Sequence, residues 1–381
     1  MKLRYWTFIL CSALWISSCS TDKDGMETEQ QIISAEDESD SPGINNGDPA
    51  EESLYFPPVT SNEWEQYTLD ELNWNPTEAD NLSEYLQEKG TDAFLVLKNG
   101  RLAIEWYYGD FSQETKHTWN SAGKTLTALM VGIAQEESKL SIEDPVTSHL
   151  NEGWTNMELE KESAITIRNQ LTMTTGLDYR EDIFCYDPEC LNFLNDPNDF
   201  WYYHNAPYTL LDQVISNATD TDFKEYYKTK IGDPIGMEGN WVKVGYNNLF
   251  FSNARSMGRF GLLILNKGDW NDVSVLSNKD YFDSMTNISQ EMNPSYGYLW
   301  WLNGKESFRA PGSENLFEGS LIPSAPIDLI AGLGANDQKL YVVPSENLVV
   351  VRLGGDASEN NLGPSSFDEG IWTRLNAVMN P

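Results

Sequence analysis

The sequence has few positive charges. Its 381 residues include 25 Lys or Arg against 59 Asp or Glu, and the formal net charge at pH 7 is −34. A chain of this charge repels polyanions, so we expect neither nucleic acid nor an anionic membrane surface as a partner. Part of the charge is local, because residues 20–52 hold eleven Asp or Glu and one Lys. That stretch is predicted to be a solvated, disordered tether that carries no information about a functional site.

Histidine and cysteine are scarce, with three and four residues respectively. His117, His149 and His204 lie in no recognisable pattern with a carboxylate, so nothing in the sequence indicates a Ser-His-Asp triad. Cys185 and Cys190 stand in the string FCYDPEC, with no histidine near them. In an oxidising compartment this spacing favours a small-loop disulfide over the rival reading, a metal site.

The apolar run near the N-terminus, Tyr5 to Ile16, is too short for a typical membrane span. Basic residues precede it and small residues follow, which predicts an export signal over residues 1–18. The string ISSC also resembles a bacterial lipoprotein signal, which implies a lipid on Cys19 and an acidic tether over residues 19–60. We therefore expect a domain anchored in the bacterial cell envelope, on the periplasmic side or the cell surface. An ordinary signal peptide is the alternative.

Strand signals concentrate at the two ends of the remaining chain. Residues 93–109, AFLVLKNGRLAIEWYYG, form two β-rich runs around an Asn-Gly turn, and residues 339–355 give two more strands. Residues 367–379 predict a closing helix, and the middle of the chain has mostly helical patterns that end at breakers. The expected class is α+β, with one antiparallel sheet from both chain ends, flanking helices and an inserted, mostly helical part. The predicted domain spans residues 61–381, with its sheet part at about 61–118 and 300–381 and its helical part at about 119–299.

The stretch WNSAGKTLTALMVGIAQEE, beginning at Trp119, contains Gly-Lys-Thr, the three residues with which phosphate-binding loops end. That loop needs a glycine where Thr118 stands, and the residues between are not glycine-rich, so they cannot wrap phosphates with backbone N–H groups. The α/β-hydrolase pattern Gly-x-Ser-x-Gly also fails, because Trp119 occupies its first glycine position. The sequence therefore argues against both a nucleotide site and a nucleophile elbow.

Ser121 and Lys124 form a Ser-x-x-Lys pair. On a helix, residues three apart share one face with Cβ atoms roughly 5–6 Å apart, and a serine near the N-terminus benefits from the helix dipole. The residues that follow are apolar or small almost all round, which predicts a buried helix. Burial would lower the pKa of the lysine and make it a base. The plainer interpretation is a capping serine and a surface lysine, and the same motif also occurs at residues 20–23, within the tether.

Three segments together resemble the class C β-lactamase-like serine hydrolases, a family that includes penicillin-binding DD-peptidases, esterases and amidases. They are NSAGKTLTALMVGIAQEESKLSIEDPVTSHL, ITIRNQLTMTTGLDY and the stretch from WYYHNAPYTLL to IGDPIGM. The resemblance covers roughly residues 106–355. It implies a β-lactamase/transpeptidase-like fold, with Ser121 as the nucleophile and Lys124 as its base.

The family's second motif, Tyr-x-Asn, matches Tyr203-His204-Asn205, although Tyr246-Asn247-Asn248 satisfies it too. We prefer the first match because APYTLL follows it. Tyr203 is expected to share the proton taken from Ser121, with its pKa lowered by cationic Lys124. Asn205 is expected to hydrogen-bond Lys124 or the substrate, with His204 pointing away.

The third motif departs from the family, because the sequence has no Lys-Thr-Gly. The matching strand is AGLGANDQKLYVVP, beginning at Ala331. The resemblance implies that N–H groups near Gly334 or Ala335, with that of Ser121, form an oxyanion hole, the glycine allowing a substrate backbone to approach. Asn336 and Gln338 are expected to offer polar contacts. The basic side chain that grips a β-lactam or peptide carboxylate is missing.

The predicted function is hydrolysis of an ester or amide in a small molecule or peptide, through an acyl-enzyme and without a metal or organic cofactor. One alternative is a β-lactamase or DD-peptidase. Another is a non-catalytic cell-envelope protein that binds a cell-wall or glycan ligand in the same cleft. The sequence defines neither the substrate nor the oligomeric state.

Overall fold

The structure is a computed structural model that describes residues 53–180, 185–359 and 362–380. The expected signal over residues 1–18, the lipid site Cys19 and the tether up to residue 52 lie outside this range. No helix in the described ranges is long and apolar enough to cross a membrane.

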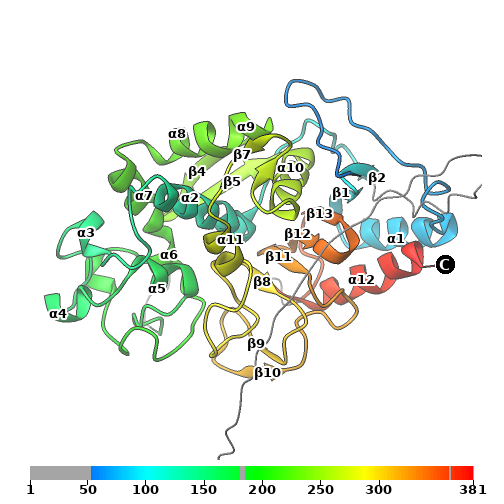
Figure 1. The fold of residues 1–381 in the computed structure, drawn as a ribbon. Coiled ribbons are helices and arrows are strands. Elements are labelled where there is room, and N and C mark those ends of the chain that lie inside the picture. Colours follow the sequence, from blue (N-terminus) through cyan, green and yellow to red (C-terminus); the bar gives the residue numbers. More distant parts are fainter. Residues whose placement is uncertain (1–52, 181–184, 360–361, 381) are drawn as a thin grey trace, which may run out of the picture. The chain divides into compact units, whose positions relative to one another are not determined.

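A six-stranded antiparallel sheet, in the order β2-β1-β13-β12-β11-β8, forms the centre of the fold (Figure 1). Two of its strands precede the helical part of the chain and four follow it. The expected sheet built from both chain ends is therefore confirmed. Its strands are β1 (Thr91–Lys98), β2 (Arg101–Tyr107), β8 (Trp301–Leu302), β11 (Ile330–Gly334), β12 (Gln338–Val343) and β13 (Leu348–Gly354).

The β1–β2 hairpin turns at the Asn-Gly pair, where Asn99 has φ 48° and Gly100 has φ 83°. Two successive positive φ angles are what a tight type I′ turn requires. A Cβ on Gly100 would also lie 1.8 Å from the Tyr55 carbonyl oxygen, and Tyr55 N–H donates to the Asn99 carbonyl at 2.9 Å. The tether was expected to reach residue 60. Residues near Tyr55 instead pack on the domain.

Helices cover both faces of the sheet. In β12, Leu340 lies 3.0 Å from the position of a Cβ on Gly261 of α10 (Ala254–Leu265). The next residue, Tyr341, meets Trp372 of α12 (Ser366–Met379) edge-on at 5.6 Å between ring centroids. Successive strand residues point to opposite faces, so α10 and α12 lie on opposite sides of the sheet. Helix α1 (Pro76–Glu88) packs beside α12 (Figure 1).

The middle of the chain is mostly helical, as expected, but it also contributes to a three-stranded sheet in the order β3-β5-β4. This sheet holds the segment before Ser121 in place, because Trp119 N–H donates to the Phe250 carbonyl at 2.8 Å. Cys185 and Cys190 are joined in a disulfide, with their Cα atoms 5.9 Å apart. The elements are β3 (His117–Thr118), β4 (Asn240–Val244), β5 (Asn247–Ser252), α2 (Lys124–Glu136), α3 (Thr147–Leu150), α4 (Leu159–Glu162), α5 (Ile167–Thr172), α6 (Asn205–Thr209), α7 (Leu211–Thr219), α8 (Phe223–Tyr227), α9 (Asp233–Ile235) and α11 (Lys279–Met285).

Short strand pairs complete the secondary structure, and none of them belongs to the central sheet. They are β6 (Asp269–Trp270) with β7 (Val273–Ser274), and β9 (Ser307–Arg309) with β10 (Leu316–Glu318).

Candidate active site

Ser121 lies in a 3-10 turn, Asn120–Gly123, between β3 and α2. Asn120 has φ 47°, a conformation that asparagine tolerates better than most residues. Its backbone N–H donates to the Thr118 hydroxyl at 3.1 Å, and its side-chain amide donates to the Ala335 carbonyl at 2.7 Å. The sharp turn before Ser121 is thus tied both to β3 and to the end of β11.

Lys124 is the first residue of α2, and every residue from Lys124 to Ala134 is buried. This confirms the buried helix that the apolar pattern predicted. The Lys124 side chain is only 4% exposed, and its Nζ donates to Ser121 Oγ at 3.0 Å. The two side chains therefore lie one helical turn apart and in direct contact, with the lysine buried and the serine half-buried.

Burial lowers the pKa of Lys124 to about 7. No acidic side chain in the described residues forms an ion pair with it. The ring faces of Tyr208 and Tyr203, with centroids 4.2 Å and 5.1 Å from Nζ, favour the ammonium form and oppose this shift. Desolvation outweighs them. Near neutral pH a large fraction of Lys124 is a neutral amine that can accept a proton.

Tyr203 stands in the same cluster, 8% exposed, with its ring stacked on that of Trp301 at 5.9 Å. Burial raises the pKa of Tyr203, while a hydrogen bond with the Ser121 side chain acts in the opposite direction and is the weaker effect. The expectation that Lys124 lowers the pKa of this phenol is therefore wrong. The same burial that discharges the lysine keeps the tyrosine protonated.

The second Tyr-x-Asn match lies elsewhere. Tyr246 lies in the turn between β4 and β5, is 38% exposed and donates its hydroxyl to Asp187. Asn205, by contrast, begins α6 two residues after Tyr203, and its Oδ1 is buried without a hydrogen-bond partner among the described residues. A buried amide oxygen left unpaired is costly, so this atom is free to accept from a ligand.

The edge of the main sheet closes the other side of the site. A Cβ on Gly334, at the end of β11, would lie 2.3 Å from the Trp119 carbonyl oxygen and 3.1 Å from the Ala122 nitrogen. The glycine is therefore required by the turn that carries Ser121, and not by the approach of a substrate backbone, as the sequence suggested. Ala335 follows directly and is half-buried. The structure brings Gly334 and Ala335 against the residues that flank Ser121.

We expect Gly334→Ala to lower both stability and activity. The clash is with a backbone carbonyl, which no side-chain rotation relieves, and overpacking of this kind costs about 1–3 kcal/mol. A displacement of the turn by about 1 Å would lower kcat by about 100-fold. Urea unfolding and turnover of 4-nitrophenyl esters measure the two effects. The matched control is Gly355→Ala, where the only atom near the new Cβ lies 3.9 Å away. Equal stability and turnover in the two variants would contradict this packing.

Buried polar side chains hydrogen-bond the backbone of the β11–β12 turn and fix its position. Arg352 is fully buried in β13, and its guanidinium donates to the carbonyls of Asn336 and Asp337 at 3.1 and 3.0 Å. Gln338 was expected to face the substrate. It is instead fully buried and donates to the carbonyls of Asn336 and Gly354 at 2.7 and 2.6 Å. Sequence reasoning missed this network, although an arginine within the apolar run NLVVVRLG is a signal for it.

In the described part of the chain, no hydrogen bond joins any of the three histidines to Ser121, and His204 Nδ1 is buried without a partner. His117 contacts the Thr118 carbonyl at 2.8 Å, and His149 contacts Asp144 at 3.2 Å. His204 is buried, which lowers its pKa to about 4, and it borders a small cavity with Tyr179 and Tyr202. In the described ranges, no three His, Cys, Asp or Glu side chains are grouped so that they could hold a metal ion.

Comparison with known proteins agrees with the fold. The sequence profile of the Beta-lactamase family matches residues 79–354, and the chain belongs to this family. The 6-aminohexanoate-dimer hydrolase of Paenarthrobacter ureafaciens is 22% identical over 322 residues, which are 73% of this chain and 76% of the relative. The teichoic acid D-alanine hydrolase of Staphylococcus aureus is 27% identical over 174 residues, 41% of this chain and 42% of that protein.

Solved structures show the same fold. A Bacillus anthracis protein, provisionally assigned as a 6-aminohexanoate-dimer hydrolase, matches with a TM-score of 0.64 at 18% sequence identity. The match covers 85% of this chain and 88% of that one. The β-lactamase/transpeptidase-like fold is thus confirmed, and the relatives named above are hydrolases.

Proposed function

We propose that this chain is a serine hydrolase that cleaves an ester or amide through an acyl-enzyme on Ser121. The observation that carries the proposal is the buried Lys124 amine, 3.0 Å from the Ser121 hydroxyl and with its pKa lowered to about 7. A serine hydroxyl is a weak nucleophile unless an adjacent base accepts its proton. The hydrolase names of the two relatives agree with this chemistry.

In the proposed first step, neutral Lys124 accepts the hydroxyl proton as Ser121 Oγ attacks the substrate carbonyl. The oxyanion that forms accepts hydrogen bonds from the N–H groups of Ser121 and Ala335. In enzymes of comparable chemistry, one such donor lowers the barrier by about 2.7–4 kcal/mol. The turn that carries Ala335 is held by Arg352 and by Asn120, so its N–H is fixed before the reaction begins.

Collapse of the tetrahedral intermediate needs a proton on the leaving group. Tyr203, a protonated phenol in contact with Ser121, donates it and regains a proton from the Lys124 ammonium. Asn205 holds the ammonium or the substrate amide through its unpaired Oδ1. Water then attacks the ester on Ser121, and the same groups act in reverse order to release the acid.

The site best fits esters and amides that lack the carboxylate group found in β-lactams. The lysine of β12, Lys339, is fully buried and binds Asp337 at 3.1 Å and Asp368 at 3.0 Å. Its ammonium group is therefore paired with these two carboxylates and is not available to a substrate carboxylate. For this reason we propose an esterase or amidase in preference to a β-lactamase or DD-peptidase.

Labelling with a fluorophosphonate, followed by peptide mass spectrometry, tests the proposal. We expect one adduct, on Ser121, together with turnover of 4-nitrophenyl esters and slow or no turnover of nitrocefin. An unlabelled Ser121 in folded protein that still hydrolyses esters would refute the assigned nucleophile. Inertness towards esters, amides and lactams alike would favour the non-catalytic binding protein.

We also propose that the enzyme is exported and held in the cell envelope through a lipid on Cys19. The support is the sequence, with basic residues, a short apolar run and ISSC before an acidic tether. Metabolic labelling with a fatty acid should mark the wild type and leave Cys19→Ser unlabelled and released from membranes. Label on both proteins, or on neither, would contradict the anchor.

A further inference from the structure

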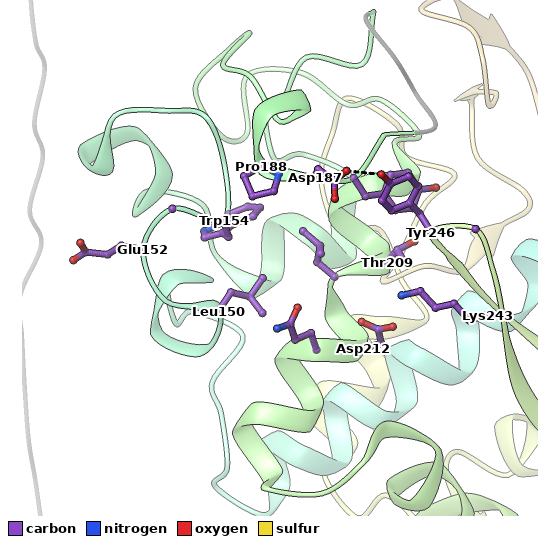
Figure 2. Close-up of a pocket in the computed structure, with 14 residues that line it drawn as sticks. Leu150, Glu152, Trp154, Asp187, Pro188, Thr209, Asp212, Lys243 and Tyr246 are labelled. Atoms are coloured by element: carbon purple, nitrogen blue, oxygen red, sulfur yellow. Dashed lines mark hydrogen bonds between the residues drawn. The ribbon is translucent and has the colours of Figure 1, made fainter.

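A cavity of about 580 Å³ lies beside the proposed active site, within the range of about 300–1,000 Å³ that is common for small-molecule sites (Figure 2). Neither Ser121 nor Lys124 lines it, and the mechanism above does not use it. The residues of interest in its lining come from α3, α7, the β4–β5 hairpin and two loops. They are Leu150, Trp154, Tyr186, Asp212, Lys243 and Tyr246.

The cavity begins within one helical turn of the proposed catalytic residues. Thr209 lines it and ends α6, the helix that Asn205 begins. Four residues of helix span about 6 Å. The residue before Thr209 is Tyr208, whose ring centre lies 4.2 Å from Lys124 Nζ. Tyr186, on another wall, is close enough to Tyr203 to contribute to its raised pKa. A group bound here could therefore belong to the same molecule as a bond cleaved at Ser121.

One side of the cavity is aromatic and apolar. The Trp154 indole is 6% exposed, and its Nε1 is buried without a hydrogen-bond partner in the described part of the chain. The rings of Tyr186 and Tyr246 lie 5.0 Å apart at 42°. Leu150 extends this surface below Trp154 (Figure 2). Flat apolar rings with N–H and O–H groups at their edges suit a ligand with an apolar face and a polar rim.

The facing side carries a carboxylate and an ammonium group together. Figure 2 shows Asp212 of α7 and Lys243 of β4 on this wall. Burial raises the pKa of Asp212, and nearby Lys243 acts against that shift, yet the two do not form an ion pair within 4 Å. Asn248 donates its side-chain amide to the Asp212 carboxylate at 3.5 Å. Acceptor and donor are thus both available. The lining also includes Glu152 and Asp187, so its carboxylates outnumber the single ammonium group of Lys243.

We propose that this cavity binds a sugar ring, and that the enzyme's substrates are esters or amides carried on a saccharide. A pyranose has apolar C–H faces that pack on aromatic rings, and a rim of hydroxyls that both donate and accept. Asp212 accepts from ring hydroxyls, while Lys243 donates to them. The substrate part of the inference rests on the proposed function, and the binding part does not.

Binding is tested in the full chain with Ser121→Ala, so that no turnover interferes. We expect N-acetylglucosamine and its β-1,4-linked dimer to quench tryptophan fluorescence saturably, and to show saturation-transfer NMR signals from their ring protons. Asp212→Asn and Lys243→Gln should each raise Kd by 10-fold or more. The exposed carboxylate Asp272, changed to asparagine, is the matched control and should leave Kd unchanged. Circular dichroism melts establish that the variants fold.

Kinetics then test the substrate class. The ratio of kcat/KM for an acetylated glucose to that for 4-nitrophenyl acetate should fall at least 10-fold in Asp212→Asn and stay constant in Asp272→Asn. Absence of saturable sugar binding would overturn the inference and leave the hydrolase proposal intact. If 6-aminohexanoate binds instead, and Asp212→Asn abolishes that binding, the cavity's ligand is an ammonium compound and not a sugar, and the inference is overturned. If the sugar binds but Ser121→Ala leaves the hydrolase activity unchanged, the proposed function is wrong and the sugar site stands.

Discussion

Ser121→Ala should abolish turnover of 4-nitrophenyl esters, with kcat lower by about five to six orders of magnitude. Removal of the nucleophile from a serine hydrolase has an effect of this size, because no acyl-enzyme can form. The fold should survive, since the side chain of Ser121 is half-buried and makes its hydrogen bonds within the site itself. The measurement is steady-state turnover beside a thermal melt of the same preparation.

The matched control for this variant is Ser112→Ala. Ser112 is exposed and its side chain contacts Thr115 at 3.0 Å, in the loop before β3. The control should hydrolyse esters at the wild-type rate. A folded Ser121→Ala protein that keeps more than a few per cent of the activity would show that another group forms the acyl-enzyme.

Lys124→Met should lower kcat by about 10²–10⁴-fold, the usual contribution of a general base, and should stabilise the protein at neutral pH. Methionine has nearly the volume of lysine and no charge to desolvate. In the wild type the pKa of Lys124 falls from 10.5 to about 7 on folding. At about 1.4 kcal/mol per pH unit, this depression costs roughly 4–5 kcal/mol of stability at low pH, and the variant should recover much of it.

The pH dependence has a definite sign. Between pH 7 and 10.5 the unfolded lysine binds a proton that the folded one does not, so wild-type stability rises across this range and is level below it. The advantage of Lys124→Met should therefore be largest at or below pH 7 and shrink towards pH 10.5. Urea unfolding at several pH values measures it. A variant that is less stable than the wild type at pH 7 would contradict a buried lysine with a depressed pKa.

Much of the scaffold could be predicted from local pattern. Asn99-Gly100 marks the β1–β2 turn, and the apolar run from Leu126 to Ala134 indicates a buried helix. The Ser121–Lys124 spacing also placed those side chains in contact, because the periodicity of a helix fixes which residues meet. These features depend on neighbours within a few residues along the chain.

What could not be predicted depends on segments distant in sequence. The pKa of Tyr203 moves opposite to the expected direction because Trp301 and other aromatic residues bury it, and no local pattern reveals that depth. Gly334 is small because the Trp119 carbonyl comes within 2.3 Å of its missing Cβ. The sequence favoured Tyr203 over Tyr246 only through the APYTLL that follows it, whereas the fold places Tyr203 in the site and Tyr246 at an exposed hairpin.

The most direct test of Lys124 as the base is the rate at which a fluorophosphonate phosphonylates Ser121, with loss of fluoride, as a function of pH under single-turnover conditions. With Lys124 as the base, the rate should rise from acid to neutral pH with a midpoint near 7, the pKa of Lys124. The same profile should be flat and low in Lys124→Met. A wild-type rate that stays constant from pH 5 to pH 9, or a rising profile that survives in Lys124→Met, would contradict the assignment of Lys124 as the base.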